Sequence, residues 1–311
     1  MNILFFGSTS DSVIVLEKLP SVSAIVTQPP KPDPTPVELW AKAHNITCLS
    51  FANNPDKRWL YQNEQQVIDT LESIKPDLII SASYGQKIPT KTLADAKFGG
   101  LNVHPSILPR WRGGDPVPWA IMSGDHQIGV SVVSLSDKFD EGLIYAQEKI
   151  PILPTDTSMP LRTKLFTIGA DLLTKLLPEY LAGKAKGKSQ LGKTEPRATR
   201  LSRETGFEPW PFAESDAIRI ERKFRAFHPW PGVWTLYNKK RLKILKLHLD
   251  NEKLILDEVQ LEGKKPVSWE QFKEAYITTV KQNAGEKIRK IHIIQKGKID
   301  YKELINNGRK Y

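Results

Sequence analysis

Cysteine is nearly absent from this chain of 311 residues, which holds a single one, Cys48. A lone cysteine excludes a disulfide framework and any metal site built from several cysteines, and it agrees with a reducing compartment. The six histidines show none of the short spacings that metal-ligating histidines have. We therefore expect a protein that needs no metal.

Long apolar runs are absent as well. No stretch of the sequence approaches the length of about 18 residues that a membrane-spanning helix needs. The first residues, MNILFFGSTSDS, lack the basic segment and the longer apolar run of a secretory signal. We therefore expect a cytoplasmic protein without a membrane partner.

Glycine is scarce in the first turn of the chain, where only Gly7 follows the apolar run 2–6. A dinucleotide-binding turn needs three glycines so that backbone amides can approach the pyrophosphate. The sequence also has no GxxxxGK[ST] loop. These absences argue against the binding of nucleotide phosphates.

Positive charge, by contrast, is plentiful in one part of the chain. Residues 1–183 hold 16 Lys and Arg against 19 Asp and Glu, a net charge of −3, whereas residues 184–311 hold 29 against 16, a net charge of +13. This asymmetry indicates that the second part faces a polyanion such as a nucleic acid. The alternative is a solvated basic surface without a partner.

Two domains are expected from the length and from a change of pattern along the chain. Up to about residue 150, short apolar runs alternate with helical patterns, as in βαβ units. We therefore predict an α/β fold with a Rossmann-like domain and a mostly parallel sheet over residues 1–183. Its last strands are expected at 129–135 and, as an antiparallel edge, at 143–150.

Residues 184–205 have the composition of a basic linker on the surface. Over residues 184–203 seven cations stand against one acid, Glu195, and they could neutralise several phosphates of a nucleic acid. Those that we expect to contact nucleic acid are Lys184, Lys186, Lys188, Lys193, Arg197 and Arg200. Beyond the linker, strands expected at 233–237, 242–249, 253–261 and 288–295 predict a small β-barrel domain over 206–311.

The densest polar motif lies at the end of a short predicted strand, in Asn102-Val103-His104. Alternation along the strand places Asn102 and His104 on the same face. A carboxamide donor beside an imidazole can stabilise a developing oxyanion and transfer protons. The alternative is a capping asparagine and a surface histidine in a turn.

Asp140 is the candidate third group. It lies in the loop after the strand 129–135, which in a parallel sheet emerges at the same edge as His104. A carboxylate there would orient the imidazole. Asp137 and Glu141 lie in the same loop, and spacing alone does not choose among the three acids.

The motif NVHPSILPRWRG at 102–113, followed by DEG at 140–142, resembles the signature of the folate-dependent formyltransferases. FFGSTSDSV (5–13), IVTQPPKP (25–32) and LIISASYGQKIP (78–89) resemble other stretches of that family. RAFHPWPGVWT (225–235) and VQLEGKKPVSWEQF (259–272) resemble the C-terminal barrel of the members that formylate methionyl-tRNA. The resemblance covers about residues 1–275 and implies a Rossmann-like catalytic domain followed by an OB-like barrel.

This resemblance implies a role for each motif residue. Asn102 would hold the formyl oxygen, His104 would stabilise the oxyanion and help proton transfer, and Asp140 would fix the charge state of His104 and accept the amine proton. The donor would be 10-formyltetrahydrofolate and the acceptor initiator methionyl-tRNA, in translation initiation, with the chain acting as a monomer. The folate site would be lined by Ser106, Ile107, Leu108 and Pro109, with Tyr84, Gly85 and Ile88 on its other side.

Arg110 and Arg112, beside this site, are predicted either to contact the tRNA or to form salt bridges within the loop. The stretch PPKPDPTP, with Lys31, is shorter than the glycine- and lysine-rich loop that usually grips the acceptor end in the tRNA-acting members. This difference moves the expected tRNA contact to the linker and barrel. Other acceptors that keep the same chemistry are an amino-sugar nucleotide and water. A nucleic-acid-binding protein with a degenerate catalytic domain is disfavoured, because Asn102, His104 and Asp140 are all present.

Overall fold

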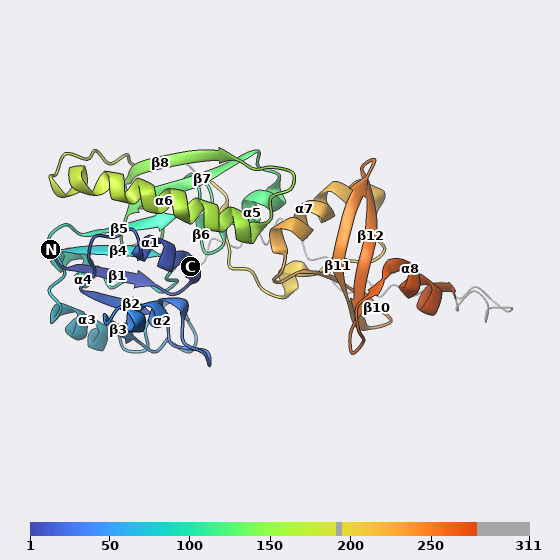
Figure 1. Ribbon diagram of the computed structural model, residues 1–311, viewed down its shortest axis with the longest axis horizontal. Coiled ribbons are helices and arrows are strands. Elements are labelled where there is room, and N and C mark those ends of the chain that lie inside the picture. The colour runs from blue at the N-terminus through green and yellow to red at the C-terminus, as the bar shows by residue number, and fades with distance from the viewer. Residues whose placement is uncertain (191–194, 279–311) are drawn as a thin grey trace. The chain divides into compact units, whose positions relative to one another are not determined.

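The computed structural model describes residues 1–190 and 195–278, which form two compact units (Figure 1). The first unit comprises Met1–Val117, Asp125–Pro154 and Met159–Ala198. The second comprises Pro118–Gly124, Thr155–Ser158 and the described residues from Thr199 onward. Within the described ranges, no helix combines the length and apolar composition needed to span a bilayer.

A seven-stranded sheet forms the centre of the first unit, in the order β3-β2-β1-β4-β5-β7-β8. The strands from β3 to β5 are parallel, whereas β7 is antiparallel to β5 and β8 is antiparallel to β7. Their bounds are β1 Ile3–Gly7, β2 Ala24–Thr27, β3 Thr47–Ser50, β4 Leu78–Ala82, β5 Gly100–His104, β7 Gln127–Ser134 and β8 Ile144–Pro151.

The direction of β7 corrects the prediction that this strand runs parallel to β5. An antiparallel neighbour needs no crossover helix packed on the sheet. The helix between the two strands, α5 (Pro116–Ser123), belongs to the second unit from Pro118 onward and supplies no such crossover. The predicted antiparallel edge strand is present as β8.

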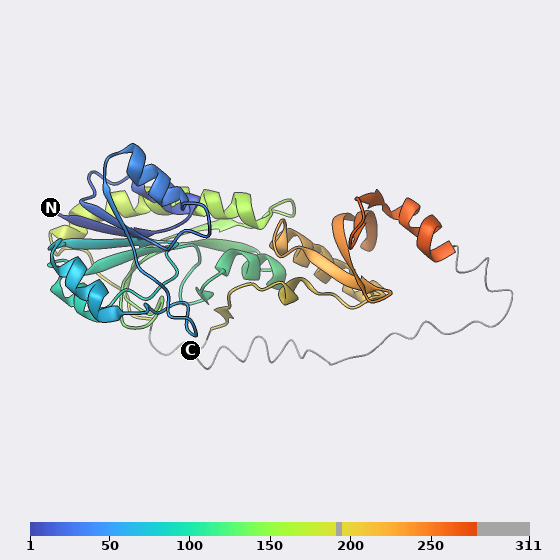
Figure 2. The same cartoon turned by 90° about the horizontal axis from the view of Figure 1, so that it is seen from below.

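Helices cover both faces of this sheet (Figure 2). Helices α1, α2 and α6 lie on one face, and α3 and α4 lie on the other. The chain runs from β1 outward to β3 and then returns to β4 and β5 on the other side of β1, and right-handed crossovers in these two directions place their helices on opposite faces. The central strands β1 and β4 are buried at every position, as expected for parallel strands covered on both sides. The helix bounds are α1 Ser10–Leu16, α2 Pro36–Ala43, α3 Glu64–Glu72, α4 Thr90–Asp95 and α6 Ser158–Leu181.

The second unit contains a four-stranded antiparallel sheet, in the order β10-β11-β12-β13. The apolar side chains of the sheet pack with those of the helices around Val259 and Phe272, both buried. A mostly parallel sheet followed by a small antiparallel β domain confirms the predicted fold class. The element bounds are α7 Ala217–Phe227, β10 Val233–Tyr237, β11 Lys240–Asp250, β12 Lys253–Leu261, β13 Val267–Ser268 and α8 Trp269–Phe272.

Part of the basic segment 184–205 pairs with strands of the first unit. Lys188 exchanges backbone hydrogen bonds with Ile144, at 2.8 and 2.9 Å. Further on, β9 (Arg197–Ala198) pairs with β6 (Arg112–Gly113), directly after the motif loop. The predicted strand 288–295 and the predicted contact residue Lys193 lie outside the described residues.

Candidate active site

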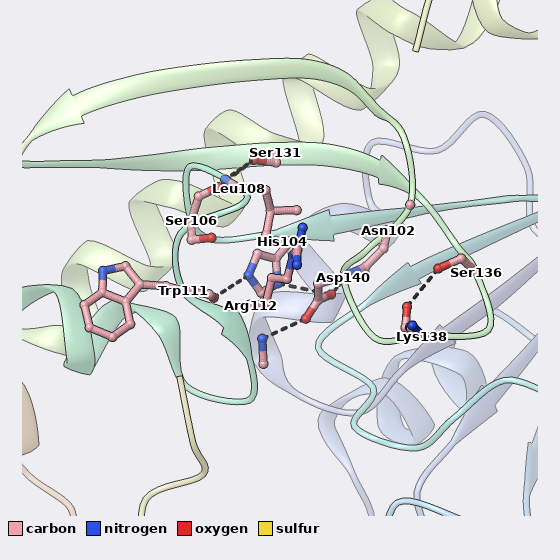
Figure 3. A network of polar contacts seen from close by, with 12 residues as sticks. Asn102, His104, Ser106, Leu108, Trp111, Arg112, Ser131, Ser136, Lys138 and Asp140 are labelled. Carbon is pink, nitrogen blue, oxygen red and sulfur yellow. Dashed lines mark hydrogen bonds and ion pairs between the residues drawn. The ribbon is translucent and has the colours of Figure 1, made fainter. Parts of the chain in front are cut away.

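The structure brings Asn102, His104 and Asp140 together (Figure 3). Both β5 side chains face one carboxylate oxygen: Asn102 Nδ2 donates to Asp140 Oδ1 at 3.2 Å, and His104 Nδ1 lies 3.4 Å from the same atom. His104 is only 4% exposed. The alternative of a surface histidine in a turn is therefore wrong.

Of the three acids in the loop between β7 and β8, Asp140 is the one that faces His104. Asp137 is exposed and pairs with Lys87 at 2.7 Å. Glu141 pairs with Arg197 at 3.1 Å. Because β7 is antiparallel, its loop leaves the sheet beside the start of β5, and Asp140 approaches His104 from the side of Asn102 (Figure 3).

Backbone and side-chain contacts fix Asp140 in place. Its backbone has a positive φ of 59°, an uncommon conformation that needs support from its surroundings. Its Oδ2 accepts a hydrogen bond from the Gly113 N–H at 2.9 Å. Gln190 Nε2 donates to the carbonyls of Asp140 at 2.9 Å and Gly142 at 2.7 Å. Gln190 was not predicted, because the composition of residues 184–205 indicates a surface linker and does not indicate a buried carboxamide.

These contacts leave one N–H of the Asn102 carboxamide available to a substrate. An asparagine carboxamide carries two N–H donors, and one of them suffices for the bond to Asp140. The second can meet an oxyanion. Asp140 Oδ1 and His104 Nδ1 lie 3.4 Å apart, slightly beyond hydrogen-bond distance, a separation that in catalytic sites often shortens when the substrate binds. The arrangement therefore fits attack of a nucleophile on a carbonyl carbon.

The loop after β5 is held by buried polar groups. Ser106 is buried and its hydroxyl donates to the Arg110 carbonyl at 2.7 Å, so it stabilises the loop itself. Ser131, on β7, donates to the Ser106 carbonyl at 2.6 Å and accepts from the Leu108 N–H at 3.2 Å. Gln147, on β8, donates to the Leu108 carbonyl at 3.0 Å. Ser131 and Gln147 gave no signal in the sequence beyond their place in predicted strands.

A cavity of about 450 Å³ lies beside this loop. Ile107, Leu108 and Pro109 form part of its wall, opposite polar groups that include Gln147 and Lys188. The cavity lining does not include Tyr84, Gly85 or Ile88. The structure therefore does not join the two predicted sides of the folate site in this cavity.

Tyr84 and Ile88 are instead buried in the core of the first unit. The hydroxyls of Tyr84 and Tyr61 lie 2.9 Å apart. Burial raises the pKa of both hydroxyls above their usual value. Gln86, in the same loop, is also buried, and its side-chain amide atoms have no hydrogen-bond partner among the described residues.

The predicted tRNA-contacting cations fall into two groups. Arg110 forms a double hydrogen bond with Asp125, at 2.9 and 2.7 Å, and Arg112 donates to Gln190 at 2.9 Å. Arg197 pairs with Glu141. The side chains in the second group are exposed, and they are those of Lys184, Lys186, Lys188 and Arg200. In the described ranges, no group of three or more His, Cys, Asp or Glu side chains could hold a metal ion.

Comparison with known proteins agrees with this geometry. Residues 1–177 match the family described as Formyl transferase, and residues 211–254 match the Formyl transferase C-terminal domain. The chain belongs to the formyl transferase family. The family match spans β1 to α6 and contains all three residues of the candidate site.

Formyl transferase relatives match over most of the chain. The methionyl-tRNA formyltransferase of Chloroflexus aurantiacus is 35% identical over 257 residues, 79% of each chain. That of Dictyoglomus turgidum is 32% identical over 324 residues, 92% of this chain and 99% of the relative. This similarity confirms the resemblance noted in the sequence.

Solved structures share the fold of this chain. The methionyl-tRNA formyltransferase of Clostridium thermocellum superposes with a TM-score of 0.53 at 18% identity, over 84% of this chain and 98% of that one. HypX of Aquifex aeolicus, in complex with tetrahydrofolic acid, superposes with a TM-score of 0.57 at 16% identity, over 87% of this chain and 46% of that one.

Proposed function

We propose that this chain transfers the formyl group of 10-formyltetrahydrofolate to the α-amine of initiator methionyl-tRNA, as a cytoplasmic monomer acting in translation initiation. The observation that carries the proposal is the convergence of Asn102 and His104 on one oxygen of Asp140. The names of the relatives that cover most of the chain support this choice of acceptor.

The reaction needs charge stabilisation at these residues and the transfer of one proton from the amine to N10 of the folate through Asp140. The deprotonated amine attacks the formyl carbon, and a C–N bond forms while the carbonyl electrons move to oxygen. The free N–H of Asn102 donates to that oxyanion, and His104, whose Nε2 faces the Trp111 carbonyl, stabilises it from its Nδ1 side when the imidazole is protonated on both nitrogens. Asp140 takes the proton from the amine.

The tetrahedral intermediate then collapses. The carbonyl re-forms as the bond between the formyl carbon and N10 of the folate breaks. N10 accepts the proton that Asp140 holds, directly or through His104, and leaves as tetrahydrofolate. The carboxylate is restored, so no net proton remains on the protein.

We place the folate beside Ser106, Ile107, Leu108 and Pro109 on one side and Tyr84, Gly85 and Ile88 on the other. The apolar lining that Ile107–Pro109 give to the cavity supports the first side. For the tRNA, the exposed lysines at 184, 186 and 188 support contact with phosphates, together with Lys193 and Arg200. Arg110, Arg112 and Arg197 would have to share their carboxylate or amide partners with the tRNA.

A transfer assay with three acceptors tests the proposal. Purified protein and 10-formyltetrahydrofolate are offered methionyl-tRNA, a 4-amino-sugar nucleotide or water alone, and formylated product and tetrahydrofolate are measured. We expect formyl-methionyl-tRNA as the main product. Turnover with only the sugar nucleotide or water would contradict the proposed acceptor, and no turnover with any of them would contradict the proposed chemistry.

A further inference from the structure

The second ring nitrogen of His104 has a backbone partner. His104 Nε2 lies 3.0 Å from the carbonyl oxygen of Trp111, while Nδ1 faces Asp140 (Figure 3). A carbonyl oxygen can only accept, so this contact keeps a proton on Nε2. The position and the tautomer of the buried imidazole therefore depend on where the Trp111 carbonyl lies.

The backbone of Trp111 adopts a conformation that needs external support. Its φ is +62°, in the left-handed region that bulky side chains rarely adopt. Such a strained conformation persists only where surrounding contacts impose it. Both N–H groups of Trp111 are held: its backbone N–H donates to the Pro196 carbonyl at 3.0 Å, and its indole Nε1 donates to Asp125 Oδ2 at 2.7 Å.

Asp125 also restrains the residue before Trp111. Arg110 Nε and Nη2 donate to the two oxygens of Asp125 at 2.9 and 2.7 Å, a paired geometry that is stronger than a single bond. The Arg110 guanidinium lies over the Trp111 ring at 4.6 Å. The Asp125 side chain is 16% exposed, so water competes little for these bonds. One carboxylate thus holds two consecutive side chains directly before the carbonyl that faces His104.

We propose that Asp125 is a positioning residue for His104. It fixes the left-handed backbone of Trp111, and the carbonyl of Trp111 in turn fixes the ring plane and the Nε2 proton of His104. Asp125 itself does not reach the reacting atoms in this scheme. The kinetic consequence rests on the function proposed above, whereas the effect on the imidazole can be measured without substrates.

Three variants remove different parts of this support. Asp125→Ala removes the bonds that Asp125 makes to Arg110 and Trp111, and Asp125→Asn keeps an oxygen acceptor for the indole. Trp111→Phe removes the indole N–H and leaves a smaller ring, while Asp125 and Arg110 stay in place. Asp171→Asn is the matched control, because Asp171 forms an exposed ion pair with Lys18 on the surface of the same unit. Circular dichroism and thermal unfolding establish that each variant is folded.

Steady-state kinetics gives the first readout. Misplacing a catalytic group by about 1 Å can cost about 10²-fold in rate. We expect Asp125→Ala to lower kcat by about 10²-fold and Asp125→Asn to lower it about tenfold. Trp111→Phe keeps the Arg110–Asp125 pair, and we expect it to lower kcat about tenfold with both KM values within about twofold. Asp171→Asn should match the wild type. An unchanged kcat in a folded Asp125→Ala or Trp111→Phe variant would overturn the proposal.

Nitrogen-15 NMR of histidine-labelled protein gives the second readout, with the His104 signals identified by their loss in His104→Asn. The wild type should show a protonated Nε2, and Asp125→Ala should show changed Nδ1 and Nε2 shifts for His104, with no change at the histidines other than His126, which directly follows Asp125 in the chain. Identical His104 shifts in both proteins would overturn the proposal even if activity falls. If the wild type formylates no acceptor, the proposed function fails, and the NMR comparison still decides the role of Asp125.

Discussion

At the scale of single residues, one carboxylate organises the candidate site. Asp140 Oδ1 meets both Asn102 and His104, and Oδ2 accepts from the Gly113 backbone. The carboxylate thus orients two side chains on β5 while its own position is set by backbone groups. A group held in this way loses little entropy when a substrate binds, which favours catalysis by preorganisation.

Replacing His104 tests the centre of this arrangement. Removal of an oxyanion donor or a general base costs about 10²–10⁴-fold in rate. We expect His104→Ala to lose formyl transfer by that factor, with a circular dichroism spectrum like that of the wild type. His126→Ala, at an exposed histidine, is the control and should keep full activity. A His104→Ala protein that transfers formyl at the wild-type rate would exclude the site.

A buried charge pair in the second unit allows a prediction about stability. Lys223 is 0% exposed, and its Nζ donates to Glu208 Oε2 at 2.9 Å. Burial lowers the pKa of Lys223 despite this partner. Arg219 also pairs with Glu208, with Nη1 at 3.0 Å from Oε2.

The two partners of this pair should respond differently to substitution. Glu208→Gln leaves a buried ammonium without its counter-charge and should lower the free energy of unfolding by about 3–5 kcal/mol. Lys223→Met removes the buried charge, while Arg219 still neutralises Glu208, and should change it by less than about 1 kcal/mol. Urea unfolding followed by fluorescence measures both values. Equal losses would contradict the assignment of the cost to the stranded lysine.

At the scale of secondary structure, the alternation of side chains along a strand and the positions of the apolar runs predicted much of the site. Alternation along β5 placed Asn102 and His104 on one face, and the buried runs predicted β1 and β4. Strand direction was not predictable from the same pattern, because a buried strand has the same residues whether it runs parallel or antiparallel. Gln190 and Asp125 were not predicted, because no pattern in the sequence joins them to their partners. Gln190 bonds to Asp140, and Asp125 bonds to Trp111.

Gly142 shows how the loop that carries Asp140 depends on its junction with β8. A Cβ atom at Gly142 would lie 1.9 Å from the Ser134 carbonyl oxygen, a contact with rigid backbone. We expect Gly142→Ala to displace the loop, lowering kcat by about 10²-fold together with thermal stability. At Gly183 an added Cβ meets no atom within 4 Å, although φ is +68°. Gly183→Ala should therefore cost about 1–2 kcal/mol of backbone strain and leave kcat unchanged.

At the scale of the whole molecule, the candidate site residues and the excess of positive charge lie in different parts of the chain. Residues 1–183, which hold Asn102, His104 and Asp140, have a net charge of −3, and residues 184–311 have a net charge of +13. A large anionic acceptor can therefore be attracted by one part while its amine reacts at another. A small formyl acceptor would gain little from such a distribution. The dependence of acceptor binding on salt concentration therefore distinguishes the two classes of acceptor.

The exposed lysines at 184, 186 and 188 make this division testable. Each phosphate contact contributes about 0.7–0.9 to the slope of log affinity against log salt. Replacing all three with glutamine should weaken tRNA binding and lower the slope by about 2. The control replaces the exposed lysines at 42, 75 and 97, which removes the same net charge elsewhere on the chain. Binding titrations at several salt concentrations distinguish the variants: equal slopes in both would mean that total charge, and not the position of residues 184–188, determines tRNA affinity.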